Sequence, residues 1–233
     1  EIEVCDWSSD VCSSDLANEP TVSFHVDAVQ AIGKIPVSSY LTDRVDFATF
    51  SGHKFHAVRG VGFVYKKAGK KITPLLTGGG QEKDFRSTTE NVAGIASMAK
   101  ALRLVTDKEE FSLPKIAKMK KIIFDELAKY EDITIFSGEG EDFAPNILTF
   151  GIKGVRGEVI VHAFEEHQIY ISTTSACSSK AGKPAGTLIS MGVPTKLAQT
   201  AVRISLDDDN DMGQVEQFLT IFKQVYAKTQ KVR

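Results

Sequence analysis

The sequence predicts an α/β protein built from two domains. Short runs rich in β-forming residues alternate along the chain with stretches whose apolar residues recur every three or four positions, which is typical of layered strands and helices. The length of 233 residues suffices for one large domain or two modest ones. The composition, 42% hydrophobic and 25% charged, is that of an ordinary globular protein and excludes wholesale disorder.

Charge and cysteine content exclude several classes of function. Thirty acidic side chains against twenty-eight basic ones give a net charge of -2, which argues against a protein that binds nucleic acid through its phosphates. No stretch approaches the roughly 18 consecutive apolar residues of a membrane-spanning helix. Three cysteines without a C-x-x-C motif form neither a disulfide framework nor a zinc site, so we expect a reducing, cytoplasmic location.

Residues 1–16 differ in character from the rest of the chain. They contain Cys5, Cys12 and the only tryptophan, and they show neither helical nor strand periodicity. We expect this segment to be non-native or disordered and its two cysteines to have no function.

Residues 17–110 are expected to form the first domain. Strands are predicted at residues 22–26, 45–50 and 61–65. The glycine-rich stretch 70–81 is predicted to be a loop, and 90–105 a helix. Three strands and one helix cannot cover both faces of a parallel sheet. We therefore expect this region to be the C-terminal part of a larger domain.

Residues 111–233 are expected to form a smaller C-terminal α/β domain. Ser112 followed by Pro114 is a helix-start signal. Strands are then predicted at residues 133–136, 147–150, 169–172 and 202–206, with helices at 157–167 and after the acidic run 207–211. We expect that acidic run to cap the last helix, because negative charge is favourable at a helix N-terminus.

Reactive side chains follow two of the predicted strands. Asp27 comes directly after the first strand, and Ser51, His53 and Lys54 follow the second. In α/β folds ligand groups lie at the carboxyl ends of strands. A lysine beside a hydroxyl and an imidazole suits Schiff-base chemistry, and an aspartate can keep a pyridine nitrogen protonated. On spacing alone the alternative stays open that Lys54 is a solvated loop lysine and Asp27 a turn residue.

Cys177 lies in a run of small and polar residues, TTSACSSKAGKPAG. A lone cysteine is often a small buried hydrophobic residue. The polar neighbours instead favour an exposed, flexible loop, where Lys180 and Lys183 would stabilise the reactive thiolate.

Four separate motifs in collinear order carry a resemblance that runs from Thr21 to the end of the chain. They are HVDAVQAIGKIPV…VDFATFSGHKFHAVRGVGFVY, GGGQEKDFRSTTENVAGI, NILTFGIKGVRGEVIVHAFEEHQIYISTTSACSS and AVRISL. Together they resemble the NifS/IscS-like cysteine desulfurases of the aminotransferase class V family, which use pyridoxal 5'-phosphate. The resemblance implies a partial pyridoxal-phosphate transferase fold of type I, truncated at its N-terminus.

The resemblance also implies a role for each matching residue. Lys54 would hold the cofactor covalently and move the Cα proton of the substrate. Asp27 would pair with the pyridinium nitrogen, and Gln30 would hydrogen-bond the phenolic oxygen of the ring. Ser51 and His53 would bind the phosphate.

Substrate and partner contacts are implied in the same way. Thr89 would reach the phosphate of the partner subunit in a homodimer, and Arg203 would hold the substrate carboxylate. Cys177 would take sulfur from L-cysteine, leaving L-alanine and a persulfide. The persulfide sulfur would pass to an acceptor protein of iron–sulfur cluster assembly or of tRNA thiolation.

The sequence departs from the family pattern at three places. Ala57 and Val58 stand where Gly-Pro is common, and Thr88 and Asp207 each stand where glycine is usual. Two alternatives remain: another class V enzyme, such as a selenocysteine lyase or an aminotransferase, and an inactive truncated fragment that only dimerises or binds partners.

The histidines are not expected to bind metal. His56, His162 and His167 have no second metal-ligating residue at useful spacing. They are interpreted as packing or surface residues.

Overall fold

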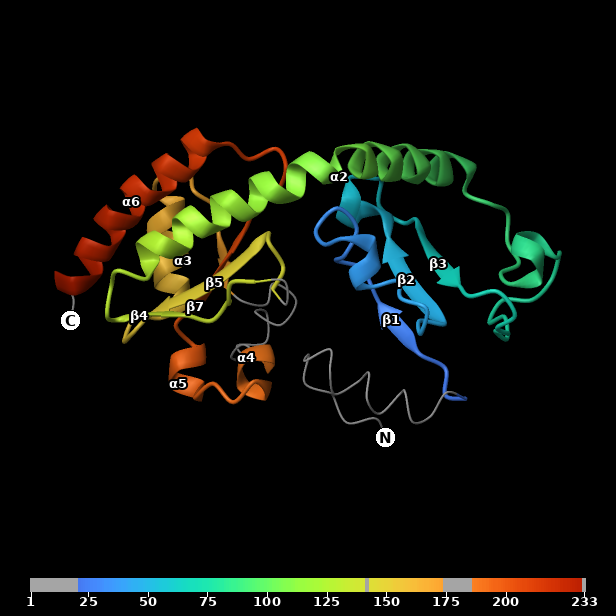
Figure 1. The fold of residues 1–233 in the computed structure, drawn as a ribbon, viewed down its shortest axis with the longest axis horizontal. Helices are drawn as coiled ribbons and strands as arrows, with labels where there is room; N and C mark the ends of the chain where they lie inside the picture. The colour runs from blue at the N-terminus through green and yellow to red at the C-terminus, as the bar shows by residue number, and fades with distance from the viewer. Residues whose placement is uncertain (1–20, 141–142, 174–185, 232–233) are drawn as a thin grey trace. The chain divides into compact units, whose positions relative to one another are not determined.

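The computed structural model describes residues 21–140, 143–173 and 186–231. The chain divides into two compact units, with the boundary between Glu110 and Phe111. Each unit contains one β-sheet, and helix α2 (Val92–Leu127) contributes to both units (Figure 1). The mixed α/β class predicted from the sequence is confirmed.

The sheet of unit 1 has three strands in the order β1-β2-β3. They are β1 (His25–Asp27), β2 (Phe47–Ser51) and β3 (Gly62–Lys66). Strands β1 and β2 are parallel, whereas β2 and β3 are antiparallel. The parallel arrangement on which the coverage argument was based thus holds for β1 and β2 and not for β3. The β2–β3 connection spans only residues 52–61, and a parallel crossover needs about a dozen residues or more.

One face of this sheet packs into the core of unit 1. Ala48 and Phe50 of β2 are buried together with Met98 and Ala101 of α2. The ring of Phe50 stacks on that of Phe63 with 4.5 Å between centroids. Because side chains alternate between the faces of a strand, the residues between these core positions point to the opposite face.

Asp46 ties together the amino ends of β1 and β2. Its Oδ2 accepts hydrogen bonds from the backbone N–H of Phe24 at 2.9 Å and from Arg44 at 3.1 Å, and its Oδ1 lies 3.0 Å from Nζ of Lys70. The bond from Phe24, followed by the two cations, holds the pKa of Asp46 below its ordinary value. This carboxylate therefore stabilises the strand pair mainly in its charged form.

Helix α2 is one helix where the sequence predicted two. It runs from Val92 to Leu127 and passes through Pro114, which was interpreted as the start of a new helix. A proline removes one backbone hydrogen bond and bends a helix but need not end it. Residues 106–113 contain no glycine, and packing fixes both halves: Met98 in the core of unit 1 and Ile116 in that of unit 2.

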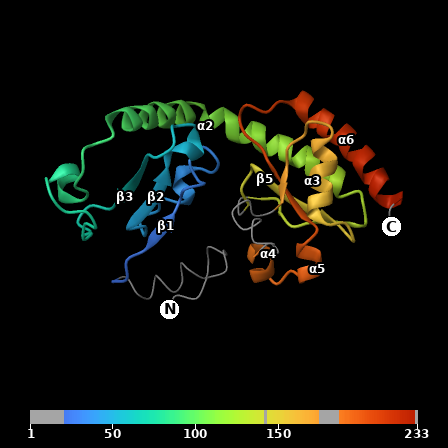
Figure 2. The ribbon, with the colours of Figure 1, turned by 180° about the vertical axis from the view of Figure 1, so that it is seen from behind.

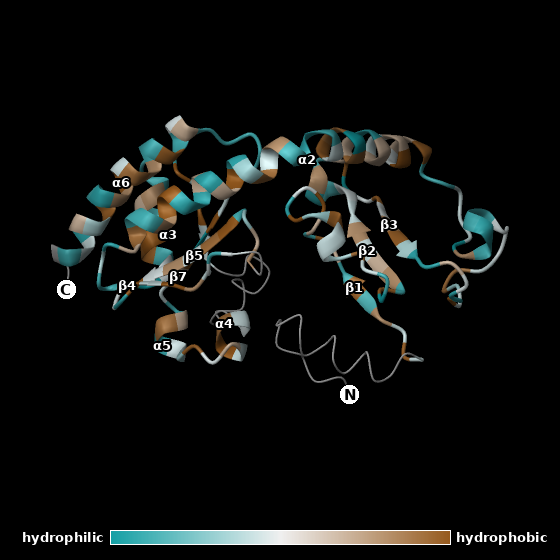
Figure 3. Ribbon diagram, in the orientation of Figure 1, coloured by the Kyte–Doolittle hydropathy of each residue, from teal (hydrophilic) through white to brown (hydrophobic). Residues whose placement is uncertain are grey.

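The sheet of unit 2 is antiparallel throughout, in the order β4-β5-β7-β6. Its strands are β4 (Ile133–Ile135), β5 (Ile147–Ile152), β6 (Ser172–Thr173) and β7 (Ala201–Ser205). Helices α3 (Gly157–Glu165) and α6 (Met212–Lys231) supply further core residues with the second half of α2. Figure 2 shows the same elements from behind, and Figure 3 shows hydrophobic residues along β5.

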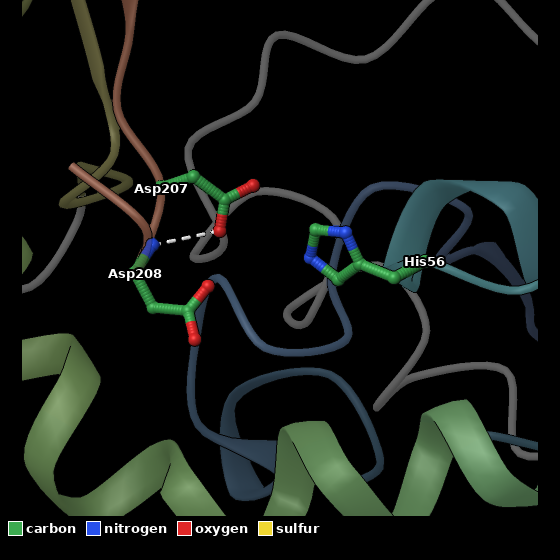
Figure 4. Close-up of side chains that lie close together, drawn as sticks. All are labelled: His56, Asp207 and Asp208. Carbon is green, nitrogen blue, oxygen red and sulfur yellow. Dashed lines mark hydrogen bonds between the residues drawn. The ribbon is translucent and has the colours of Figure 1, made fainter.

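The acidic run before α6 caps that helix as predicted. The Oδ1 of Asp211 accepts the backbone N–H of Gln214 at 2.9 Å, and Oε1 of Gln214 accepts the N–H of Asp211 at 3.2 Å. This reciprocal pair is a capping box. Earlier in the run, the backbone N–H of Asp208 donates to Oδ1 of Asp207 at 2.8 Å (Figure 4).

The sequence analysis did not predict two short helices of unit 2. Helices α4 (Gly186–Ser190) and α5 (Thr195–Ala198) are too short to show a periodic pattern. Leu188 and Ala198 pack with Ala201 of β7 on the side of the sheet away from α6 (Figure 1). Across the described ranges, no helix has the length and apolar character needed to cross a membrane.

Asp46→Asn tests the anchor of the unit 1 sheet. The pKa of Asp46 is lowered in the folded state, so its contribution to stability is present above its unfolded pKa of about 3.9 and is lost as pH falls through the folded pKa. We expect the variant to unfold at a lower temperature than the wild type at pH 7. We also expect a smaller further loss on acidification to pH 3, measured by thermal unfolding.

The exposed Asp43 provides the matched control, as Asp43→Asn. Equal acid-induced losses in the wild type and in Asp46→Asn would contradict this role of Asp46.

Candidate functional site

Strand pairing in unit 1 brings two of the predicted site residues to one edge of the sheet. Asp27 ends β1, and its partner in the parallel register is Thr49 of β2, two residues before Ser51. The backbone N–H of Ala28 donates to the carbonyl of Thr49 at 3.1 Å and continues the pairing past the end of β1. Asp27, Thr49 and Ser51 thus share the face opposite the unit 1 core.

Lys54 lies on a short turn directly after β2. The 3₁₀ helix η2 (Gly52–Phe55) carries His53 and Lys54, both exposed, and buries Phe55 to 1% exposure. The turn closes at His56, which has a left-handed φ of 71° (His56 is labelled in Figure 4). The buried Phe55 ring thereby fixes a turn whose lysine faces solvent.

Ser51 and His53 form a pair of adjacent polar groups. The Oγ of Ser51 and Nδ1 of His53 lie 3.0 Å apart in a hydrogen bond. The bond places a hydroxyl and an imidazole side by side at the end of β2, and both groups can donate to an anion. The Ala57–Val58 departure leaves this turn closed, since the N–H of Ala57 donates to the carbonyl of Gly52 at 3.0 Å.

Asp27 and Gln30 lie on the turn that follows β1. The Oδ1 of Asp27 accepts the backbone N–H of Val29 at 3.1 Å, which fixes the carboxylate locally. Ala28 and Ala31 are buried on the core side of this turn, whereas Asp27 and Gln30 are exposed. The carboxylate keeps lone pairs for a ligand.

The glycine-rich segment before Thr89 has an unusual backbone. After Gly80, with a φ of 79°, three successive residues, Glu82, Lys83 and Asp84, have φ values of 53°, 56° and 66°. Left-handed conformations cost free energy for residues with a Cβ and concentrate at functional segments. Thr89 is exposed between this segment and α2, and no hydrogen bond between described residues joins it to the other predicted site residues.

Arg203 lies at the centre of the unit 2 sheet. Its register partners are Thr149 of β5 and Ser172 of β6. Among the described residues, its buried Nε has no hydrogen-bond partner. Buried donors are nearly always paired in proteins, so this atom indicates a missing partner or a ligand.

Cys177 lies outside the described residues, as do Cys5 and Cys12. The predicted role of Cys177 therefore remains a prediction. In the chain it stands between β6, which ends at Thr173, and α4, which begins at Gly186.

His162 and His167 lie apart from the predicted site residues in the sequence, on helix α3 and just after it. Nδ1 of His162 lies 2.9 Å from a carboxylate oxygen of Glu165 on the same helix, at the exposed surface. His167 is half-buried, and its Nε2 has no hydrogen-bond partner within the described ranges. These placements fit the surface and packing roles predicted for both residues.

Sequence reasoning missed three polar neighbours of the predicted site residues. Thr49 lies beside Asp27, and Thr149 and Ser172 lie beside Arg203. Their signal is the register between strands, which a single sequence does not state, because each residue on its own is an ordinary strand threonine or serine.

Comparison with known proteins reveals a family match over most of the chain. The aminotransferase class-V family matches residues 14–218. A NifS/IcsS protein homolog of Lactobacillus delbrueckii subsp. bulgaricus is 46% identical over 94% of this chain and 57% of that protein. The cysteine desulfurase IscS of Dictyoglomus turgidum is 36% identical over 83% of this chain and 49% of that protein.

Solved structures that are similar to this chain include NifS-like proteins, as do its sequence relatives. A NifS-like protein from Rickettsia africae matches with a TM-score of 0.78 and 32% identity, over 91% of this chain and 56% of that structure. Another NifS-like protein matches with a TM-score of 0.79 and 33% identity, over 94% of this chain and 56% of that structure. The chain thus spans about half the length of the relatives it matches.

Replacing Arg203 tests whether it is kept for a ligand rather than for folding. Arg203→Met removes the unpartnered Nε and keeps most of the side-chain volume. We expect the free energy of unfolding of unit 2 to equal that of the wild type or exceed it by up to about 3 kcal/mol, because the variant loses no internal hydrogen bond and no longer buries an unpaired donor. Chemical denaturation measures this difference.

Thr200→Val is the matched comparison, since the Thr200 hydroxyl donates to the carbonyl of Leu197 at 2.7 Å. A loss above about 2 kcal/mol in Arg203→Met would instead show a structural role for Arg203.

Proposed function

Because this chain belongs to the aminotransferase class-V family, we propose that it is a pyridoxal-phosphate-dependent cysteine desulfurase, an enzyme that removes sulfur from L-cysteine and yields L-alanine. The proposal is supported most by one edge of the unit 1 sheet, where β1 ends at Asp27, β2 ends at Ser51, and Lys54 follows on the next turn. Relatives named as NifS homologs and cysteine desulfurases support the same choice within the family.

The groups at this edge fit pyridoxal phosphate. The exposed Asp27 carboxylate suits the ring nitrogen, and Gln30 on the same turn suits the phenolic oxygen. The adjacent Ser51 hydroxyl and His53 imidazole suit the phosphate. Lys54 supplies the amine for covalent attachment. The bound cofactor acts as an electron sink that stabilises charge developing at the substrate Cα.

Each residue then has a defined task. The Nζ of Lys54 removes the proton from the substrate Cα and returns it later. The Asp27 carboxylate holds a proton on the pyridine nitrogen through a charge-assisted hydrogen bond. Ser51 and His53 fix the phosphate end, so that the lysine on the following turn reaches one side of the substrate.

Arg203 and Cys177 serve the substrate. The Arg203 guanidinium binds the carboxylate of L-cysteine. Cys177 follows Ser172, the register partner of Arg203, by only five residues. Its thiolate attacks the substrate sulfur: the C–S bond breaks, an S–S bond forms on Cys177, and the carbon takes a proton to give alanine.

The domain assignment follows from the same proposal. Unit 1 corresponds to the C-terminal part of the large cofactor-binding domain, and unit 2 to the small domain that carries the Cys177 segment. The described backbone keeps Arg203 on a strand and Lys54 on a turn.

Partners belong to the proposal as well. We place the protein in a cytoplasmic homodimer in which Thr89 contacts the phosphate bound by the partner subunit. Its exposed position after a strained turn supports this role. The persulfide sulfur passes to an iron–sulfur scaffold or a tRNA-thiolating enzyme.

Borohydride trapping tests the role of Lys54. After incubation with pyridoxal phosphate and reduction, peptide mass mapping should find the label on Lys54, because its amine is exposed and the adjacent Ser51–His53 pair would hold the phosphate beside it. Lys54→Ala should lose the label, and the control Lys71→Ala, which removes another exposed lysine of unit 1, should keep it. A label on a different lysine, or none, would contradict the proposal.

Cys177→Ala tests the sulfur-accepting role. We expect the variant to retain cofactor absorbance while sulfide release from L-cysteine under reductant falls about a hundredfold or more, because the nucleophile is gone. Ser178→Ala serves as the neighbouring control. Undiminished sulfide release would favour a class V enzyme that does not use this thiol.

A further inference from the structure

Arg203 is flanked on both sides by hydroxyl-bearing residues. In the antiparallel ladders its Cα partners are Thr149 on β5 and Ser172 on β6. Partner positions in adjacent strands place side chains on the same face with Cβ atoms about 4.5–5.5 Å apart. The three side chains therefore form a row across three strands, which we call the Arg203 row.

The Arg203 row lies on the sheet face opposite the main core. The neighbours of Thr149 on β5, Leu148 and Phe150, are fully buried in that core, as is Val202 beside Arg203. Since side chains alternate, Thr149 and Arg203 point the other way. Helices α4 and α5 pack against this second face at Ala201, two residues before Arg203. The Arg203 row is the polar part of the same face.

The row is partly buried, and its donors are not satisfied internally. Thr149 is 9% exposed, and its backbone N–H donates to Oγ of Ser137 at 2.8 Å, which fixes β5 at this point. The Nε of Arg203 is buried without a partner among the described residues, and no hydrogen bond that joins described residues uses the hydroxyl of Thr149 or Ser172. A partly buried guanidinium and two hydroxyls are three donor groups that share no acceptor among the described residues.

A small carboxylate matches this arrangement. A guanidinium binds a carboxylate through charge-assisted hydrogen bonds, and a carboxylate has about four lone-pair positions to offer. Two hydroxyls beside the cation can occupy the positions that the guanidinium leaves open. Low exposure strengthens each of these bonds, because water competes less.

We propose that Thr149 and Ser172 bind the carboxylate of the amino-acid substrate together with Arg203, one hydroxyl on each side of the guanidinium. The inference deepens the proposed function and rests on it for the identity of the substrate. It assigns substrate-binding roles to two residues that the sequence motifs leave unassigned. It also links substrate binding to β6, the strand that leads into the Cys177 segment.

The test measures binding of propionate, a carboxylate without an amine, to the whole protein and its variants by isothermal titration calorimetry. We expect Thr149→Val and Ser172→Ala each to weaken propionate binding by about threefold to tenfold, the net worth of one hydrogen bond. Thr149→Ser and Ser172→Thr keep the hydroxyl and should restore binding. Ser205→Ala, on the same face of β7 two residues beyond Arg203, should leave it unchanged. Propionamide, the neutral analogue, should not bind.

The outcomes separate this inference from the proposed function. Propionate affinity that falls in Arg203→Met but stays at the wild-type value in Thr149→Val and Ser172→Ala would overturn the roles of the hydroxyls and leave the desulfurase proposal intact. Wild-type affinity in all three variants would overturn the carboxylate site as a whole. Labelling of Lys54 by borohydride reports on the proposed function independently, because it needs no substrate carboxylate.

Discussion

The parallel pairing of β1 with β2 is the constraint on which the candidate site depends. The register sets Asp27 opposite Thr49. The last residue of β1 and the turn that follows β2 therefore lie at the same edge of the sheet. Slipping this register by one residue would move Ser51 to the core face. Asp46 at the amino end and the Ala28–Thr49 hydrogen bond at the carboxyl end fix it. The role proposed for Lys54 therefore depends on a backbone ladder of three residue pairs.

In unit 2, antiparallel strand pairing determines which residues lie beside Arg203. Its main core is apolar and buried, and Arg203 with its register partners Thr149 and Ser172 lies on the other face of the same sheet. The guanidinium of Arg203 is a cation on that face, and its buried Nε has no hydrogen-bond partner among the described residues. Leaving a buried donor unpaired costs about 1–3 kcal/mol, a cost that a bound carboxylate would remove. Such exceptions to local consistency are expected at functional sites.

Much of the fold could be predicted because its signals are local. Strand runs such as residues 45–50, and the capping residue Asp211, depend on neighbours in the sequence. The continuous α2 helix could not be predicted, since packing in two cores outweighs the single bond that Pro114 removes. The antiparallel β3 and the hydroxyls beside Arg203 depend on pairing between distant segments, which periodicity does not encode. The candidate site residues were predicted from motifs. Their neighbours Thr49, Thr149 and Ser172 could be identified only from the register between strands.

We infer that Asp27, at the end of β1, and Lys54, on the turn after β2, act on one cofactor molecule. The protonation state of the pyridine nitrogen, read by NMR of protein-bound, ¹⁵N-labelled pyridoxal phosphate, tests it most directly. We expect a protonated nitrogen at neutral pH in the wild type and a deprotonated one in Asp27→Ala, because the variant lacks the carboxylate that would hold the proton. The same ¹⁵N shift in both proteins would contradict the shared site.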